Sequence, residues 1–272
     1  MYRGFELKLS YAYIKSFLHL VDDFADTIEY NGINTNPGPD DFYKNYYKNS
    51  IKDIQDKINS FLKTLDGQVL DADKIKNIFF PNSEAHIFLS HSHSDESLAL
   101  RLKFYLERKY KLRVFDDSTV WGSADKLLYF LDNKYNKTGD ETYGYRGSNY
   151  TASNVYLLLA SAIDDMMDKS ECILFLNTEN SVLTYNRKDR RAIISAPWIF
   201  HELFMTKVLR KHQDRTHFSR MDESVQMTHT MDLSHLELVD DRIFQEVLES
   251  CSSGTMFLDE LYRTVDLTNG IK

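Results

Sequence analysis

Apolar residues recur with a helical period through the first 65 residues of the chain. They form two stripes with alternating spacings of four and three residues, separated by a cluster of Asn, Gly and Pro over 31–39. This pattern predicts two antiparallel helices joined by a loop, and Asp71 is a suitable N-cap for a short third helix over Ala72–Phe79. The first stripe comprises Leu7, Tyr11, Ile14, Leu18, Val21, Ala25 and Ile28, and the second Tyr47, Ile51, Ile54, Ile58, Phe61 and Leu65.

The predicted helical region, 1–80, has two interpretations. Its apolar seam can pack on the domain that follows, or its heptad-like spacing can serve self-association or the sensing of a partner. The sequence leaves both open. Pro81-Asn82-Ser83 marks the boundary to the second region, 84–272.

From residue 84 short apolar runs alternate with helical stretches. Strands that alternate with helices predict a parallel sheet covered on both faces, with a binding crevice at the carboxyl ends of the strands. Each run ends in polar residues. The predicted strands are Ala85–Leu89, Val114–Phe115 and Cys172–Leu176, and the predicted helices Glu96–Tyr110, Val155–Met167 and Trp198–Leu209.

Two segments are insertions that a minimal α/β unit does not require. Asp132–Ser153 is a long polar insertion, and Glu179–Ile194 is a second one with a basic run. Long loops in a compact domain are usually functional or disordered. Towards the C-terminus we expect one or two strands within 225–238 and two helices, over Asp241–Glu249 and Leu258–Val265.

Composition and charge narrow the class of protein. The chain has 272 residues, 42% of them hydrophobic, which allows one large domain or two modest ones with a sizeable core. Lys and Arg number 33 against 41 Asp and Glu, a net charge of −8. This balance disfavours a non-specific grip on nucleic acid or on an anionic membrane.

Cysteine usage and the chain's start favour a cytoplasmic protein. Cys172 and Cys251 lie far apart and provide no zinc-binding spacing. The first residues carry charges where a signal peptide needs an apolar segment, and no apolar run approaches about 18 residues. We therefore expect no membrane association.

The loop Ser90-His91-Ser92-His93-Ser94-Asp95 invites a metal-binding interpretation. Its His-x-His-x-Asp pattern resembles the loop of metallo-β-lactamase-like hydrolases, but Glu96 stands where that pattern has a second-metal histidine. We therefore predict no metal. The structural alternative is a helix N-cap at Ser94 or Asp95 with solvated histidines.

Glu202 is the second candidate. It lies one turn after Trp198 on the face of a predicted helix that also carries Met205 and Leu209. An acidic residue on an apolar stripe is costly unless it faces a cleft or a partner. The alternative is a carboxylate that only complements the dipole near the helix N-terminus.

Four segments carry a shared pattern in a fixed order: Ala85–Asp95, Leu112–Asp117, Ala162–Leu176 and Ser195–Leu203. Together they resemble the Toll/interleukin-1 receptor (TIR) domain family, in particular the bacterial TIR proteins of antiphage defence of the Thoeris type. The helical element resembles the family's Ser-x-Trp-x-x-x-Glu-Leu motif, with its serine one residue further upstream. The enlarged segment after the second strand, the basic insertion and the C-terminal region depart from the pattern.

The resemblance implies a flavodoxin-like domain over 84–272 with a central five-stranded parallel sheet. It also implies an enzyme, an NAD+ nucleosidase or ADP-ribosyl cyclase that cleaves the nicotinamide–ribose bond, with NAD+ as substrate and no cofactor. Glu202 matches the family's catalytic glutamate. The substrate-binding residues that the resemblance suggests are Ser90, His91, Ser92, Phe115, Asp116, Trp121 and Trp198.

The resemblance also implies partners. TIR domains assemble through TIR–TIR contacts, so a homo-oligomer is expected, and a downstream effector can sense the product nucleotide. A non-catalytic TIR adaptor that acts only through assembly is the alternative function. The spacing of Trp198 and Glu202 favours the enzyme.

Overall fold

The computed structural model describes most of the chain, which divides into two compact units. Unit 1 comprises residues 1–36, 84–116 and 167–272, and unit 2 comprises 37–83 and 117–166. The described residues are 3–28, 41–47, 56–57, 59–61, 71–79, 84–116, 118–140, 142–186, 188, 190–194, 196–209, 229–251 and 256–270.

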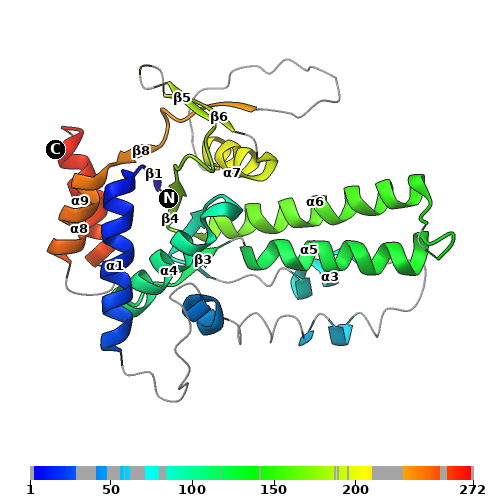
Figure 1. The fold of residues 1–272 in the computed structure, drawn as a ribbon. Coiled ribbons are helices and arrows are strands. Elements are labelled where there is room, and N and C mark those ends of the chain that lie inside the picture. The colour runs from blue at the N-terminus through cyan, green and yellow to red at the C-terminus, as the bar shows by residue number, and fades with distance from the viewer. Residues whose placement is uncertain are drawn as a thin grey trace. The chain divides into compact units, whose positions relative to one another are not determined.

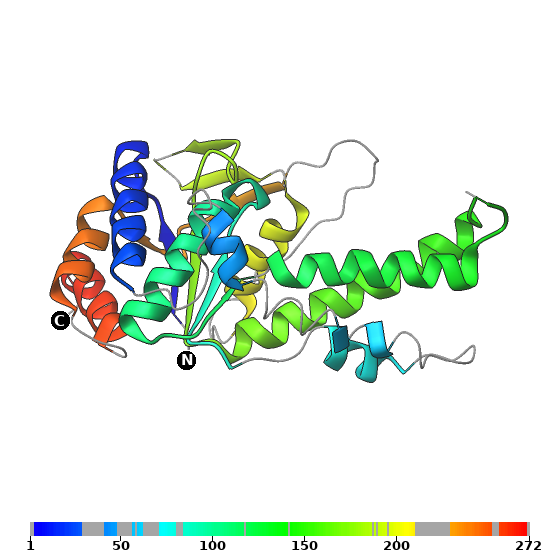
Figure 2. The same ribbon diagram turned by 60° about the horizontal axis from the view of Figure 1, so that its bottom comes forward.

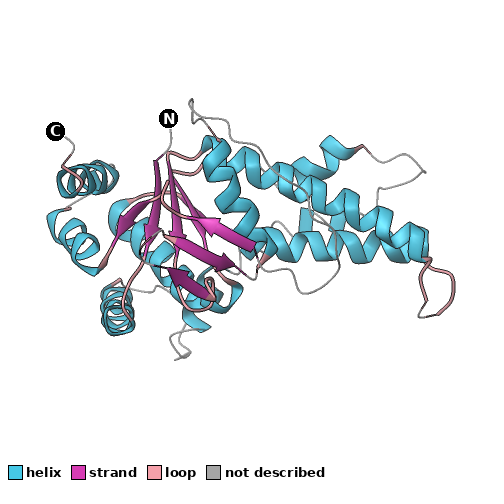
Figure 3. Ribbon diagram, turned by 90° about the horizontal axis from the view of Figure 1, so that it is seen from above, coloured by secondary structure: helices cyan, strands magenta, loops and turns pink. Residues whose placement is uncertain are grey.

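Unit 1 contains a five-stranded parallel sheet (Figure 3). Every residue of β2 and β4 is buried, as expected for inner strands of a sheet that is covered on both faces. The all-parallel sheet with its helices confirms the expected α/β class and is consistent with a flavodoxin-like fold. In sheet order the strands are β3 (Val114–Asp116), β2 (Ile87–Ser90), β4 (Cys172–Leu176), β1 (Arg3–Leu7) and β8 (Glu237–Val239).

Strand β1 is not the helix start that the sequence predicts. It lies between β4 and β8 and pairs with both in parallel. Phe5, Glu6 and Leu7 are all buried. The sequence Phe5-Glu-Leu-Lys-Leu9 alternates apolar and polar residues as a strand can, but this signal is only five residues long and Leu7 also fits the helical stripe that follows. Because the N-terminal strand belongs to the sheet, the two units do not coincide with the expected regions 1–80 and 84–272.

The helix after β1 agrees with the predicted stripe. Helix α1 spans Tyr11–Thr27, and its N-cap Ser10 accepts a hydrogen bond from the Tyr13 amide at 3.2 Å. It packs on α4 (Glu96–Tyr110) through aromatic rings, with Phe17 and Tyr105 centroids 5.7 Å apart. Aromatic residues therefore form the contact between these two helices.

The C-terminal helices also match the prediction. Helices α8 (Asp241–Ser250) and α9 (Met256–Thr268) pack against each other beside α1 (Figure 1). The Phe5 ring of β1 stacks on Tyr262 of α9, with centroids 5.8 Å apart. Helix α9 therefore covers the Phe5 side of β1, which leaves Glu6 on the opposite side of the sheet.

The insertion over 179–194 is a β-hairpin. It contains β5 (Thr184–Asn186) and β6 (Arg191–Ile194), and β7 (His229–Asp232) completes a second, antiparallel sheet. The strands expected within 225–238 are thus present, but β7 and β8 belong to different sheets. Side chains of this small sheet and of α7 (Pro197–Val208) form one buried cluster with Phe175 of β4.

Unit 2 contains a helical hairpin. Helices α5 (Ser118–Leu131) and α6 (Tyr145–Lys169, whose last three residues fall in unit 1) lie side by side in opposite directions (Figure 2). A π-helical turn over Asp132–Asn136 extends α5. The expected polar loop 132–153 is therefore largely helical, and polar side chains connect its two helical parts, since the Asn136 side-chain amide donates to the Thr151 hydroxyl at 2.7 Å.

Helix α3 (Ala72–Phe79) confirms the predicted third helix in its residues and in its cap. The Lys74 amide donates to Asp71 Oδ1 at 3.1 Å. Lys76 of this helix pairs with Asp165 of α6 at 2.6 Å. None of the described helices is both long and apolar enough to cross a membrane.

Several predictions fall outside the described residues. They are the loop 31–39, most of the second stripe after Tyr47, the boundary 81–83, Arg187 and Asp189 of the basic run, and Ser195.

Candidate active site

The topology of the sheet marks the carboxyl ends of β2 and β4 as the expected position of a ligand. β3 lies on one side of β2 and β4 on the other, so the strand order reverses between these two neighbours. Ligands of doubly wound α/β proteins bind at such switch points. Ser90 is the last residue of β2, and Asn177 and Thr178 follow β4 directly.

Glu202 of α7 reaches this edge of the sheet. Pro197 starts the helix, and Ile199 and Leu203 anchor it in the core, which brings Glu202 towards the sheet. The Ser90 hydroxyl donates to Glu202 Oε2 at 2.5 Å, and each residue is only 1% exposed. This is a direct contact between two residues that the sequence singles out, 112 positions apart.

Burial makes this contact energetically important. A carboxylate removed from water loses its hydration, and hydrogen bonds inside the protein must compensate. O–H donors to a carboxylate form short, strong bonds of about 2.5–2.7 Å. Ser90 therefore both supports Glu202 and sets the direction of its carboxylate.

The loop after β2 is fastened to the loop after β4. Asp95 accepts a hydrogen bond from the Thr178 hydroxyl at 2.5 Å and one from the Asn180 amide at 2.7 Å. Asp95 occupies the N-cap position of α4, but its side chain makes no capping hydrogen bond. His91 and Ser92, both buried, lie in the loop that this contact holds. Sequence reasoning missed Thr178 and Asn180, because only the sheet order brings them to Asp95.

The histidines of this loop do not converge on an ion. His93 is exposed while His91 is buried, and the Asp95 oxygens accept from Thr178 and Asn180. Within the described part of the chain, no three His, Cys, Asp or Glu side chains come together as a metal site requires.

Two further predicted substrate-binding residues, Trp198 and Phe115, are half-buried and contact other aromatic rings. Trp198 is half-buried, and its ring meets His201 edge-on at 6.1 Å. Half-buried Phe115 contacts Phe88 at 5.4 Å.

Asp116 and Trp121 are the last two candidates. Asp116 is buried in an ion pair with Lys103 of α4 at 2.5 Å, which explains it as a structural anchor of β3. Trp121 belongs to α5 in unit 2, and its side chain is not among those described.

A second buried carboxylate, Glu6, lies on the same face of the sheet as Ser90. In the strand register both residues pair with Phe175, from opposite sides. Strands are about 4.8 Å apart, so the backbones of Glu6 and Ser90 are about 10 Å apart. Sequence reasoning missed Glu6 because it did not recognise β1 as a strand.

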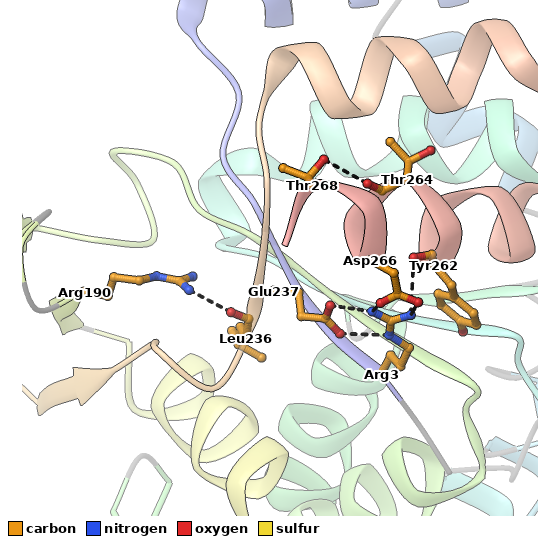
Figure 4. Close-up of polar contacts among 8 residues, drawn as sticks. All are labelled: Arg3, Arg190, Leu236, Glu237, Tyr262, Thr264, Asp266 and Thr268. Carbon is orange, nitrogen blue, oxygen red and sulfur yellow. Dashed lines mark hydrogen bonds and ion pairs between the residues drawn. The ribbon is translucent and has the colours of Figure 1, made fainter. Parts of the chain in front are cut away.

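Glu6 has a partner for each of its carboxylate oxygens. Asn177 donates to Glu6 Oε1 at 2.6 Å, and Arg190 forms an ion pair with the other oxygen. Arg190 also donates to the Leu236 carbonyl at 2.8 Å (Figure 4). Burial lowers the pKa of Arg190, but hydrogen bonds to Glu6 and Tyr185 outweigh it and raise that pKa overall.

Fold and site together define a class: an α/β protein with a parallel sheet and a buried carboxylate–hydroxyl pair at its switch point. Comparisons with protein-family models, with curated proteins and with solved structures found no match.

Proposed function

We propose that this protein cleaves the bond between nicotinamide and ribose in NAD+, with Glu202 as the catalytic carboxylate. The contact between Ser90 and Glu202 carries the proposal. In this contact a buried glutamate has a defined orientation at the carboxyl end of a parallel sheet, the edge at which doubly wound proteins bind their ligands. The resemblance to TIR enzymes, drawn from the sequence, supplies the substrate.

The chemistry requires few groups. The C1′–N bond breaks with its electron pair going to the pyridinium nitrogen, so nicotinamide leaves as a neutral molecule without a general acid. The ribose is left with oxocarbenium character, which the Glu202 carboxylate stabilises while it orients the ribose hydroxyls. Water then adds its oxygen to C1′ and releases a proton to give ADP-ribose. Another nucleophile gives a cyclic or conjugated nucleotide.

The other candidates take supporting roles in this proposal. His91 and Ser92 line the edge of the site next to Ser90, and Trp198 forms part of its wall. Phe115 contacts the nucleotide or a neighbouring protomer. The biological role is antiphage immunity, through depletion of NAD+ or through a signal nucleotide that an effector senses.

One observation favours the second candidate, a non-catalytic adaptor. Ser90 and Glu202 are as inaccessible to solvent as side chains whose hydrogen bond has only a structural role. An adaptor needs the pair only to hold α7 on the sheet, whereas an enzyme must admit substrate to the carboxylate. Glu202→Gln removes the charge of this side chain but keeps its shape. The substitution is therefore expected to abolish the activity of an enzyme and to leave the assembly of an adaptor intact.

The test is to incubate the purified protein, at low and at high protein concentration, with NAD+ and to identify the products by mass spectrometry. We expect nicotinamide release, and a loss of at least about 100-fold in Glu202→Gln, since the amide cannot balance the cationic centre. Glu246→Gln, an exposed change on α8, is the control and keeps full activity. Unchanged turnover by folded Glu202→Gln overturns the assignment, and no turnover by wild-type protein at any concentration favours the adaptor.

A further inference from the structure

Helix α6 has an uncharged segment that is long for a surface helix. From Gly147 to Ile163 its sequence contains no Asp, Glu, Lys or Arg over 17 residues. At the chain's average of 27% charged residues, about five would be expected. Charge depletion together with tyrosine is the composition of the core of a protein–protein interface.

Most of the packing of this segment inside unit 2 is on one side; near its C-terminal end the Ser161 hydroxyl also accepts a hydrogen bond from Lys76 of α3 at 2.7 Å. Val155, Leu159 and Ala162 are buried and follow the helical period of an inward stripe. On the outward side Tyr150 is 75% and Leu157 is 69% exposed. These two lie seven residues apart and therefore share one face, with exposed Ser153 and Asn154 between them. We call Tyr150, Ser153, Asn154 and Leu157 the outer α6 face.

We propose that the outer α6 face binds a second copy of this chain, helix against helix, about a two-fold axis. This inference concerns unit 2 alone and does not depend on the proposed function. A two-fold interface must be complementary to itself, because each residue meets the same patch on the partner.

The polar side chains of the face meet that condition. The Ser153 hydroxyl donates to the Asn149 carbonyl and one Asn154 N–H donates to the Tyr150 carbonyl, each at 2.8 Å. The second N–H and the side-chain oxygen of Asn154, and the Tyr150 hydroxyl, can still donate and accept, so these two side chains can each pair with their own copy. Lysine or glutamate in these positions would oppose a like charge. A nucleic acid or another highly charged partner would instead select complementary charges, which this face lacks.

The net charge of the chain also favours a second copy as the partner of the outer α6 face. Two chains of net charge −8 repel each other, and an uncharged zone is where they can approach most closely. The exposed parts of Tyr150 and Leu157 amount to about 300 Å² on each copy, taking about 200 Å² for each full side chain. That is enough for the centre of an interface of about 800 Å² per partner.

Sedimentation velocity of the full chain tests the dimer. We expect reversible dimerisation between about 1 and 200 μM, and a weakening of at least about tenfold by Tyr150→Glu or by Leu157→Glu. Tyr11→Glu on α1 is the matched control, since Tyr11 is 83% exposed and lies in unit 1. All three positions are exposed, so far-UV circular dichroism is expected to show an intact fold.

A cysteine variant tests the geometry independently of affinity. Both native cysteines are buried, so Asn154→Cys adds the one accessible thiol among the described positions. Near a two-fold axis the two copies of this thiol meet, and mild oxidation is expected to give a disulfide-linked dimer, whereas exposed Glu246→Cys is expected to give none.

Three outcomes overturn the proposal. They are wild-type protein that stays monomeric at about 200 μM, a dimer that tolerates both glutamate variants, and cross-linking of Asn154→Cys no faster than that of Glu246→Cys. Binding of a different protein to this face of a monomeric chain counts against it as well.

Discussion

Ser90 contributes a single hydroxyl, but that hydroxyl is a donor to a carboxylate with almost no exposure to water. Removing one partner of such a pair leaves the other to bear its full desolvation cost. The residue is therefore expected to matter for stability as well as for the orientation of Glu202.

Ser90→Ala is expected to lower the free energy of unfolding by about 1–3 kcal/mol. In a double-mutant cycle with Glu202→Gln, we expect a coupling of about 1–2 kcal/mol, because the two side chains touch directly. Urea unfolding measures all four proteins. Ser16→Ala on the exposed side of α1 is the control, and strictly additive effects of Ser90→Ala and Glu202→Gln would contradict the contact.

His86 makes stability depend on pH. Its Nδ1 accepts a hydrogen bond from the Arg113 amide at 2.9 Å, which requires this nitrogen to be unprotonated. Burial, followed by the charge of Arg113, lowers the pKa of His86 below its ordinary value of 6.5. The unfolded chain therefore takes up this proton first as the pH falls, so stability is full above about pH 6.5 and declines below it.

The difference between wild-type protein and His86→Gln isolates this effect, because the carboxylates titrate in both. Wild-type protein is expected to lose more stability than the variant between about pH 7 and pH 5. Urea unfolding at the two pH values measures the two losses. Equal losses in the two proteins would show that His86 does not titrate in this window.

Among the elements, those with an unbroken apolar period are predictable from the sequence. Helix α4 spans the predicted residues Glu96–Tyr110, and α3 begins at its predicted cap. Strand β1 is not predictable in this way, because the spacing from Leu7 to Tyr11 continues the stripe of α1. Its extended form depends on pairing with β4 and β8, which are remote in the sequence.

The residues of the candidate site also differ in whether the sequence reveals them. Ser90 and Glu202 stand in motifs, so local sequence reveals them. Glu6 and its partners Asn177 and Arg190 come from three segments that only the sheet order and the β5–β6 hairpin bring together. No local pattern in the sequence marks such a cluster, since each residue alone resembles an ordinary polar surface position.

Strand β1 is held at its start by Arg3. Its guanidinium pairs with Glu237 of β8 and with Asp266 of α9, the latter at 2.7 Å, and lies 4.9 Å from the centre of the Tyr262 ring (Figure 4). Burial lowers the pKa of Arg3, but the hydrogen bonds to Glu237 and Asp266 raise it overall. One side chain thus joins two strands and a helix.

Arg3→Ala is expected to cost about 1–2 kcal/mol of unfolding free energy, less than a buried pair because its partners are partly exposed. Arg263→Ala, which removes an exposed pair with Glu260 within α9, is expected to cost much less. Thermal unfolding at low and high salt compares them. Equal losses in the two variants would show that Arg3 does not tie the elements together.

On the scale of the molecule, the chain passes repeatedly between the two units. Unit 1 is assembled from three segments and unit 2 from two, so neither is a continuous stretch of sequence. The central sheet pairs the first strand with the last. Opening the sheet therefore requires contacts between distant segments to break together, whereas a helix at its periphery can open locally.

The two native cysteines report on these two kinds of opening. Cys172 is fully buried in β4, and burial raises its thiol pKa far above the ordinary value. Cys251 follows α8, is 7% exposed, and burial raises its pKa to about 11. Since the thiolate is the reactive form, both are expected to react slowly with iodoacetamide at about pH 8 in the folded protein.

Pulsed alkylation with mass spectrometry, over increasing urea, separates the two sites. Cys251 is expected to become reactive at lower urea than Cys172, because fraying of α8 exposes it while the sheet stays closed. Cys172 is expected to react only in the global unfolding transition that circular dichroism records. Alkylation of Cys172 ahead of that transition would mean that β4 opens independently, and the parallel sheet would then not be the most stable part of the molecule.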